Sequence, residues 1–167
     1  VRTFMRLGAL WDCMSSTRSR APGFAESETQ RLIRETARDV ASEFDDEYWI
    51  AVSDDERTAD EFWQACADAG FLGATVPEEY GGEGMGISEL ATIVEELTAN
   101  GCMGAGMLIV VNVVFGAVTL TNHGTDEQKA ELLEPLVDGD CRFCMALTEP
   151  NAGHNAPNLD TFAEEKA

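Results

Sequence analysis

Residues 147–153 (Leu-Thr-Glu-Pro-Asn-Ala-Gly) have the residue types of a ligand-binding strand end. An apolar run ends in the hydroxyl residue Thr148, Pro150 forces a turn, and Gly153 lets a ligand come close to the backbone. Such a strand end offers backbone N–H groups and a hydroxyl to a planar heteroaromatic ligand or to its phosphate. The residue types therefore make this segment the first candidate for a binding site.

A second glycine-rich stretch, residues 81–86, invites comparison with a phosphate-binding loop. Its glycines do not form the G-x-x-x-x-G-K-[ST] pattern, and the glutamates at positions 78, 79 and 83 would repel an anion. We interpret the stretch as a structural turn. His123 stands directly before Gly124 and is also predicted to be structural, at a helix end where its charge suits the helix dipole.

Neither the cysteines nor the carboxylates indicate a metal site or a nucleophile. Cys141 and Cys144 form one C-x-x-C, but no second cysteine pair exists, and neither His123 nor His154 stands at zinc-site spacing. We interpret the five cysteines as small thiols in a reduced interior. The clustered acids are predicted to be solvated faces: Asp45, Asp46, Asp54, Asp55, Glu95 and Glu96.

Composition bounds the class of protein. A chain of 167 residues with 44% hydrophobic residues is long enough for one domain with a real core, despite a net charge of −20. Residues 1–22 carry a net charge of +3, so the remainder carries −23. This charge disfavours nucleic acid and anionic membrane surfaces as partners. It is typical of a protein from a salt-rich cytosol, with an ordinary acidic protein as the alternative.

The chain contains no uninterrupted apolar run of the roughly 20 residues that a membrane-spanning helix needs. The richest stretch, residues 107–120, is interrupted by Asn112 and Gly116 and is predicted to be a buried core helix in a soluble domain. Residues 1–22 are rich in Arg and Ser and poor in acids. We interpret them as a weakly ordered extension of a cytoplasmic protein; the alternative is a transit peptide leading to an organelle matrix.

Helix signals follow one another from Gly23 to Gly139. Ser27 precedes a first helix with apolar residues at 3- and 4-residue spacings, and Gly70 ends a second helix that begins near Phe62. Ser88 is predicted to cap the third helix. A fourth, almost wholly apolar helix from about residue 107 to 122 is expected at the centre of the bundle, and Thr125 begins the fifth.

The character of the sequence changes after the last helix. Residues 143–148 are short, apolar and followed at once by Glu-Pro, which predicts a strand, and the tail has room for one more. The predicted fold class is therefore mostly α: a helical bundle over residues 23–141, followed by one or two strands of an incomplete β domain over residues 142–167.

Residues 145–153 (Met-Ala-Leu-Thr-Glu-Pro-Asn-Ala-Gly) closely resemble the T-E-P-x-x-G signature of the acyl-CoA dehydrogenases. Further similarities precede it in the family's order: Gly-Phe-Leu-Gly at 70–73, Val-Pro-Glu-Glu-Tyr-Gly-Gly at 76–82, Ile-Val-Glu-Glu-Leu at 93–97 and Gly-Thr-Asp-Glu-Gln-Lys at 124–129. Together these motifs cover roughly residues 24–165. The chain resembles the N-terminal helical domain of this family plus the start of its middle β domain.

The resemblance implies an FAD-dependent oxidoreductase. The family removes an α-proton and a β-hydride from an acyl-CoA to give the trans-2-enoyl-CoA. It passes the electrons to an electron-transfer flavoprotein, and it works as a homo-oligomer when full length. By position, the flavin contacts are expected to be Met145, Leu147, Thr148, Gly153 and His154. The acyl slot is expected to be lined by Val111, Asn112 and Phe115, with His154 also near the substrate.

Two features depart from the family pattern. Gly153 is followed by His154 and Asn155 where the family has Ser-Asp, and Met145 takes the place of an aromatic residue; it can pack on a flavin but cannot donate a hydrogen bond. No residue of this chain is predicted to be the catalytic base. We expect a fragment that is inactive alone. The alternative is a non-catalytic helical interaction module or a decayed gene product that keeps the domain fold.

Overall fold

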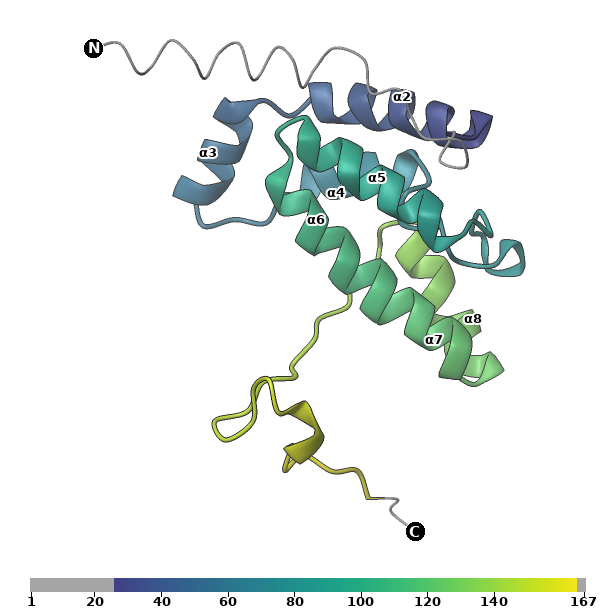
Figure 1. Cartoon of the computed structure of the whole chain (residues 1–167), viewed down its shortest axis with the longest axis vertical. Helices are drawn as coiled ribbons and strands as arrows, with labels where there is room; N and C mark the ends of the chain where they lie inside the picture. Colours follow the sequence, from purple (N-terminus) through teal and green to yellow (C-terminus); the bar gives the residue numbers. More distant parts are fainter. Residues whose placement is uncertain (1–25, 165–167) are drawn as a thin grey trace.

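The computed structural model describes residues 26–164 (Figure 1). The extension predicted for residues 1–22 lies outside the described residues. The helices, in chain order, are α2 (Glu28–Ser42), α3 (Asp46–Asp54), α4 (Asp60–Asp68), the 3-10 turn η1 (Glu78–Tyr80), α5 (Ile87–Ala99), α6 (Met103–Ile109), the π-helical η2 (Val110–Val118), α7 (Thr119–His123), α8 (Asp126–Val137) and the 3-10 turn η3 (Ala156–Asn158).

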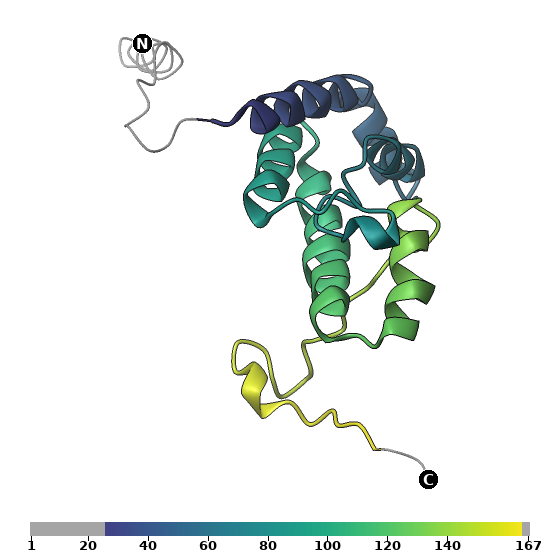
Figure 2. The same ribbon diagram turned by 90° about the vertical axis from the view of Figure 1, so that its right-hand side faces the viewer.

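The helices pack around one long rod. α6, η2 and α7 follow one another without a break, and α5 and α8 lie beside this rod (Figures 1 and 2). α2 packs across α5 at one end of the bundle. The segment after α8 passes the rod and then extends away from the helices, carrying η3 near the C-terminus. The predicted helical bundle is confirmed.

The signals that are local in sequence predicted the helix ends well. Ser27 Oγ accepts the N–H of Gln30 while the Gln30 side chain accepts the N–H of Ser27, and Thr125 and Gln128 repeat this reciprocal arrangement at the start of α8. Gly70, at φ +76°, lies directly after the last turn of α4 in the left-handed conformation that favours glycine.

A single apolar core holds the helices together. The apolar face of α2 is buried as its spacing predicted, and α4 inserts Phe62 and Trp63 with almost no exposure. Each fully buried large side chain contributes roughly 1.5–3 kcal/mol. The largest such side chains come from α4, the loop after it, α5, the rod and α8: Trp63, Phe62, Leu72, Ile93, Leu97, Ile109, Leu133 and Leu136.

Two helix predictions need correction. The third helix begins at Ile87, before Ser88, because the Glu89 carboxylate accepts the N–H of Gly86 and fixes the start there. α3 was not expected, since the sequence shows only a cluster of acids at its start. Asp45 caps α3 by accepting the N–H of Tyr48, so this acid has a structural role beyond being solvated.

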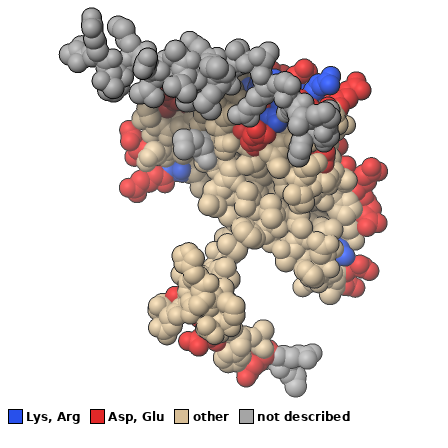
Figure 3. Space-filling model, viewed as in Figure 1, with Lys and Arg blue, Asp and Glu red and all other residues tan. Residues whose placement is uncertain are grey.

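The apolar rod is not surrounded by protein on all sides. One face is fully buried through Ala105, Ile109, Val113 and Ala117, whereas Met107 on another face is 70% exposed. The prediction that the rod lies at the centre of the bundle is therefore only half right. Among the described residues, the stretch Gly104–His123 of the rod is also the one helix long and apolar enough to cross a membrane, a test that core helices of soluble proteins pass as well. Figure 3 shows that the surface over the rod has few charged side chains.

The predicted strand at residues 143–148 is absent from the described chain. Residues 143–148 are extended but form no ladder, and an isolated bridge between Glu149 and Ala152 is the nearest sheet-like pairing. The physical reason is that a strand needs a partner strand for its N–H and C=O groups, and residues 26–164 offer none.

Candidate functional site

A hollow of about 240 Å³ lies where the C-terminal segment passes the rod. Its residues come from η2 and α7 on one side and from the segment after α8 on the other: Val111, Phe115, Gly116, Thr119, Phe143, Cys144 and Met145. The hollow thus brings together two of the residues expected to line the acyl slot, Val111 and Phe115, and one expected to contact the flavin, Met145.

Asn112 joins the two walls of this hollow. Its side chain is buried, and Oδ1 accepts the backbone N–H of Phe143 at 2.5 Å, while Nδ2 donates to the carbonyl oxygen of Leu108 at 2.8 Å. Asn112 is not one of the residues that line the hollow. Its role as a substrate contact stays a prediction, and its observed contacts are structural.

Gly116 allows the close approach of Phe143. A Cβ atom at Gly116 would lie 2.4 Å from Cδ2 of Phe143, far inside van der Waals contact. The glycine therefore creates the space in which the Phe143 ring lies against η2, one helical turn after Asn112.

Arg142 fixes the start of the C-terminal segment. Its guanidinium lies 2.6 Å from Oδ1 of Asp60 and 4.9 Å from the ring centroid of Trp63. Trp63 in turn donates from Nε1 to the carbonyl oxygen of Gly139 at 2.7 Å. Hydrogen bonds from Thr58 and from Arg142 lower the pKa of Asp60. The path of the chain from the end of α8 to Phe143 is thus held by α4.

Glu149 of the T-E-P motif closes a small loop of its own. Its carboxylate accepts the N–H of Asp160 at 2.7 Å and the N–H of Thr161 at 2.9 Å, and it also accepts the Thr161 hydroxyl. These bonds, led by the one from the Thr161 hydroxyl, lower the pKa of Glu149. Sequence reasoning did not assign this residue a role. Its partners lie 11 and 12 residues further along the chain, so no local signal could have shown them.

The other predicted cofactor residues lie on this extended part. Thr148, Gly153 and His154 are exposed, as are the apolar side chains of Met145 (48%) and Leu147 (45%). Gly153 donates its N–H to Oδ1 of Asn155. The hollow includes Met145 but none of the other four, so their roles toward cofactor or substrate remain predictions.

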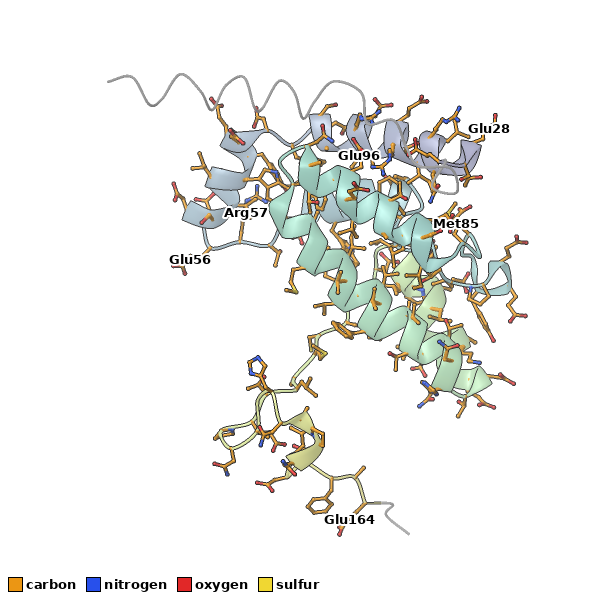
Figure 4. The ribbon with its side chains drawn as sticks, viewed as in Figure 1. Glu28, Glu56, Arg57, Met85, Glu96 and Glu164 are labelled. Carbon is orange, nitrogen blue, oxygen red and sulfur yellow. The ribbon has the colours of Figure 1, made fainter. Side chains whose placement is uncertain are left out.

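One of the acids predicted to be solvated, Glu96, is not. Glu96 lies on α5 facing α2, with its side chain only 10% exposed, and it pairs with Arg34 and Arg38 at 2.7 Å each (Figure 4). Burial raises the pKa of Glu96, but hydrogen bonds from Arg34, Arg38 and Asn100 outweigh this and lower it. This cluster joins α2 to α5 and does not belong to the hollow.

The four cysteines of residues 26–164 fall into two groups, and Cys13 lies outside the described residues. Cys66 and Cys102 are buried in the core, and burial raises the pKa of the Cys66 thiol to about 12. Cys141 and Cys144 carry free thiols, and Cys144 is exposed and lines the hollow. Within residues 26–164 no group of three or more His, Cys, Asp or Glu side chains is placed to hold a metal ion.

Met145, in the hollow, and Leu147, just beyond it, fit a flavin in chemical character. Met145 and Leu147 present exposed apolar side chains that suit the face of an isoalloxazine ring. In the described part of the chain, the backbone N–H groups of residues 144–148 donate no hydrogen bond, so they remain able to pair with a ligand or a further strand. The described residues therefore form a helical domain with an apolar hollow where the C-terminal segment leaves the helices.

The sequence model of the family "Acyl-CoA dehydrogenase, N-terminal domain" matches residues 27–140. The chain belongs to the acyl-CoA dehydrogenase family and contains its N-terminal helical domain, and this family uses FAD. The acyl-CoA dehydrogenase FadE12 of Mycobacterium tuberculosis is 34% identical over 140 residues, which cover 84% of this chain and 36% of the relative.

Solved structures of acyl-CoA dehydrogenases share the fold of this chain, and two of them illustrate the match. Butyryl-CoA dehydrogenase from Megasphaera elsdenii matches with a TM-score of 0.72 and 27% identity, over 83% of this chain and 37% of that one. An acyl-CoA dehydrogenase from Bacillus anthracis in complex with FAD matches with a TM-score of 0.72 and 28% identity, over 84% of this chain and 24% of that one. The chain thus spans about a third of the length of its curated relatives.

Proposed function

We propose that this chain is the N-terminal part of an FAD-dependent acyl-CoA dehydrogenase that converts an acyl-CoA to the trans-2-enoyl-CoA. The observation that carries the proposal is the hollow, because it places Val111 and Phe115 opposite Met145. The reaction requires the acyl chain and the flavin to lie against each other, and we propose these residues for the two sides of that contact.

When bound, FAD supplies the acceptor for the β-hydride, while the α-proton goes to a carboxylate base. We propose none of these 167 residues as that base and expect it in the two thirds of the relatives' length that this chain does not span. The residues of this chain would bind the acyl chain and the flavin and would exclude water from the site. Phe115 and Val111 shield the acyl chain, and the Thr148 hydroxyl donates a hydrogen bond that stabilises negative charge on the flavin.

The same proposal covers partners and location. The complete protein would bind acyl-CoA, pass electrons to an electron-transfer flavoprotein and form a homo-oligomer. The net charge of −20 on these 167 residues argues against nucleic acid and anionic membranes as partners and is compatible with a cytoplasmic protein.

Flavin absorbance tests this proposal. The chain is purified alone and also co-expressed with the reading frame that follows it in its gene, and each preparation is desalted after incubation with FAD. We expect the flavin band at about 450 nm only in the co-expressed protein, and bleaching of that band by members of an acyl-CoA panel.

The alternatives give different results. If acyl-CoA bleaches the flavin band in the presence of the 167-residue chain alone, the proposal that the catalytic base lies outside these residues is contradicted. A co-expressed protein that holds FAD but is bleached by no acyl-CoA would contradict the dehydrogenase activity. A protein that holds no FAD at all would favour the non-catalytic helical module.

A further inference from the structure

We infer that Asn112 is a positioning residue, which sets the flavin-contacting segment at a fixed distance from the helix that lines the acyl slot. The inference rests on the proposed function and gives Asn112 a role other than touching substrate. It follows from the contacts of three residues: Asn112, Gly116 and Phe143.

Both polar atoms of the Asn112 side chain are engaged inside the protein. Nδ2 bonds to the carbonyl oxygen of Leu108, one turn earlier on the same rod, and this bond orients the amide. Oδ1 is thereby presented to the N–H of Phe143, 31 residues later in sequence. With 5% of the residue exposed, the amide oxygen and one N–H of the Asn112 side chain are both engaged inside the protein, so its observed contacts are structural.

The Asn112–Phe143 bond is the last attachment of the chain to the helices. Among residues 26–164, no hydrogen bond or ion pair joins any residue after Phe143 to the helical body. Residues 144–148, which include Met145 and Thr148, therefore start from a backbone position that Asn112 defines.

Gly116 supports the same contact from the next turn. It leaves room for the Phe143 ring, so one residue is held by its backbone and by its side chain at once. Asn112 and Gly116 both lie in η2, a stretch of π-helical turns. Such turns are rare and occur frequently at functional sites. The neighbouring residues on η2, Val111 and Phe115, are those that line the hollow.

A positioning role makes a prediction that a substrate contact does not. Displacement of residues 144–148 by even about 1 Å misaligns the donor and acceptor of a hydride and slows the transfer strongly. The binding of the acyl chain, which depends on Val111 and Phe115, changes little. Loss of the bond therefore lowers the limiting rate of flavin reduction rather than the affinity for acyl-CoA.

The first measurement uses the 167-residue chain without cofactor. Amide hydrogen exchange of Phe143 is followed by NMR in the wild type, Asn112→Leu and Asn112→Asp. Asn122→Leu is the matched control, because Asn122 makes the same side-chain bond to the carbonyl four residues earlier but is exposed. We expect exchange of Phe143 to accelerate about tenfold or more in Asn112→Leu and by less than about twofold in Asn122→Leu.

The second measurement uses the co-expressed flavoprotein. We expect the limiting rate of flavin reduction by a saturating acyl-CoA to fall about tenfold or more in Asn112→Leu, with the half-saturating concentration changed by less than about threefold. Asn112→Asp keeps an oxygen acceptor for Phe143 and loses the donor to Leu108. Its limiting rate of flavin reduction should therefore lie between those of the wild type and Asn112→Leu. Asn122→Leu should match the wild type.

The outcomes separate the inference from the proposed function. If no acyl-CoA reduces the wild-type flavoprotein, the proposed function fails and the inference fails with it. If the wild type is reduced and Asn112→Leu is reduced equally fast, or if Phe143 exchange does not respond, the inference alone is overturned. Should Asn112→Leu not fold by circular dichroism, Asn112→Asp decides: a rate no different from wild type, with faster exchange at Phe143, rejects the positioning role.

Discussion

Arg34 and Glu96 lie 2.7 Å apart at the crossing of α2 and α5, 62 residues apart in sequence and largely shielded from solvent. Arg34 also reaches Glu26 at 2.5 Å and Glu95 at 2.7 Å, so one guanidinium binds three carboxylates. These bonds raise the pKa of Arg34, led by the one from Glu95. In a domain with this excess of acids, two arginines add ion pairs to the apolar contacts between α2 and α5.

Glu96→Gln is expected to destabilise the chain by about 2 kcal/mol. The substitution keeps the size of the side chain but leaves the arginines facing it without their best-buried partner. Breaking a buried pair typically costs about 3–5 kcal/mol, and the remaining bonds of Arg34 to Glu26 and Glu95 reduce that loss. Urea unfolding followed by circular dichroism measures the change.

Glu61→Gln is the matched control for this change. Glu61 pairs with Arg57 at 2.8 Å, but its side chain is 60% exposed, and exposed pairs contribute about 0–1 kcal/mol. Equal losses in the free energy of unfolding for Glu96→Gln and Glu61→Gln would show that the α2–α5 cluster stabilises the chain no more than an exposed ion pair does.

Acid is expected to destabilise the domain partly through Glu96. Its carboxyl pKa is lower in the folded chain than in the unfolded one, so its contribution is complete above the unfolded value of about 4.3. The contribution is lost as the pH falls through the folded-state pKa. The free energy of unfolding should therefore fall below about pH 5, less steeply in Glu96→Gln than in the wild type. If the free energy of unfolding falls with pH as steeply in Glu96→Gln as in the wild type, Glu96 does not contribute to the acid destabilisation.

Signals that lie within a few residues of one another predicted this fold well. Ser27 and Thr125 each meet their capping partner three residues later, and Gly70 ends its helix by its own backbone preference. The acyl-CoA dehydrogenase motifs are equally local, and the family they indicate is confirmed.

Contacts between distant residues were beyond sequence reasoning. Glu96 looked like one more solvated acid because its partner Arg34 lies on another helix. Asn112 stood out as an interruption of an apolar run and, by the family resemblance, as an acyl-slot residue; its bond to Phe143 could not be seen, since the N–H it accepts belongs to a residue 31 positions away. The predicted strand failed for the same reason: an extended segment becomes a strand only when another strand bonds to it.

Alkylation should distinguish the cysteines. Cys144 is exposed, whereas Cys66 is fully buried and burial raises the pKa of its thiol to about 12, which disfavours the reactive thiolate. Iodoacetamide should modify Cys144 in the native chain and Cys66 only after unfolding in urea, as read by peptide mass spectrometry. Native labelling of Cys66 at a rate near that of Cys144 would mean that the core around α4 opens readily.

Gly116→Ala tests the fit between the rod and the C-terminal segment. Alanine favours a helix over glycine by about 0.5–1 kcal/mol. At position 116, however, the added Cβ would lie 2.4 Å from the Phe143 ring, and such overpacking costs about 1–3 kcal/mol. We expect a net loss of about 1 kcal/mol and faster amide exchange at Phe143, since the ring must leave η2.

Gly104→Ala on the same rod provides the comparison. A Cβ at Gly104 would lie 3.7 Å from Cζ3 of Trp49, an ordinary contact, so helix propensity alone should act and stabilise the chain by about 0.5 kcal/mol. Opposite signs for the two substitutions would show that the rod at Gly116 is shaped by Phe143. Stabilisation by both substitutions would mean that the Phe143 ring does not pack against Gly116. The C-terminal segment would then not lie against η2, and the hollow between them would not exist as described.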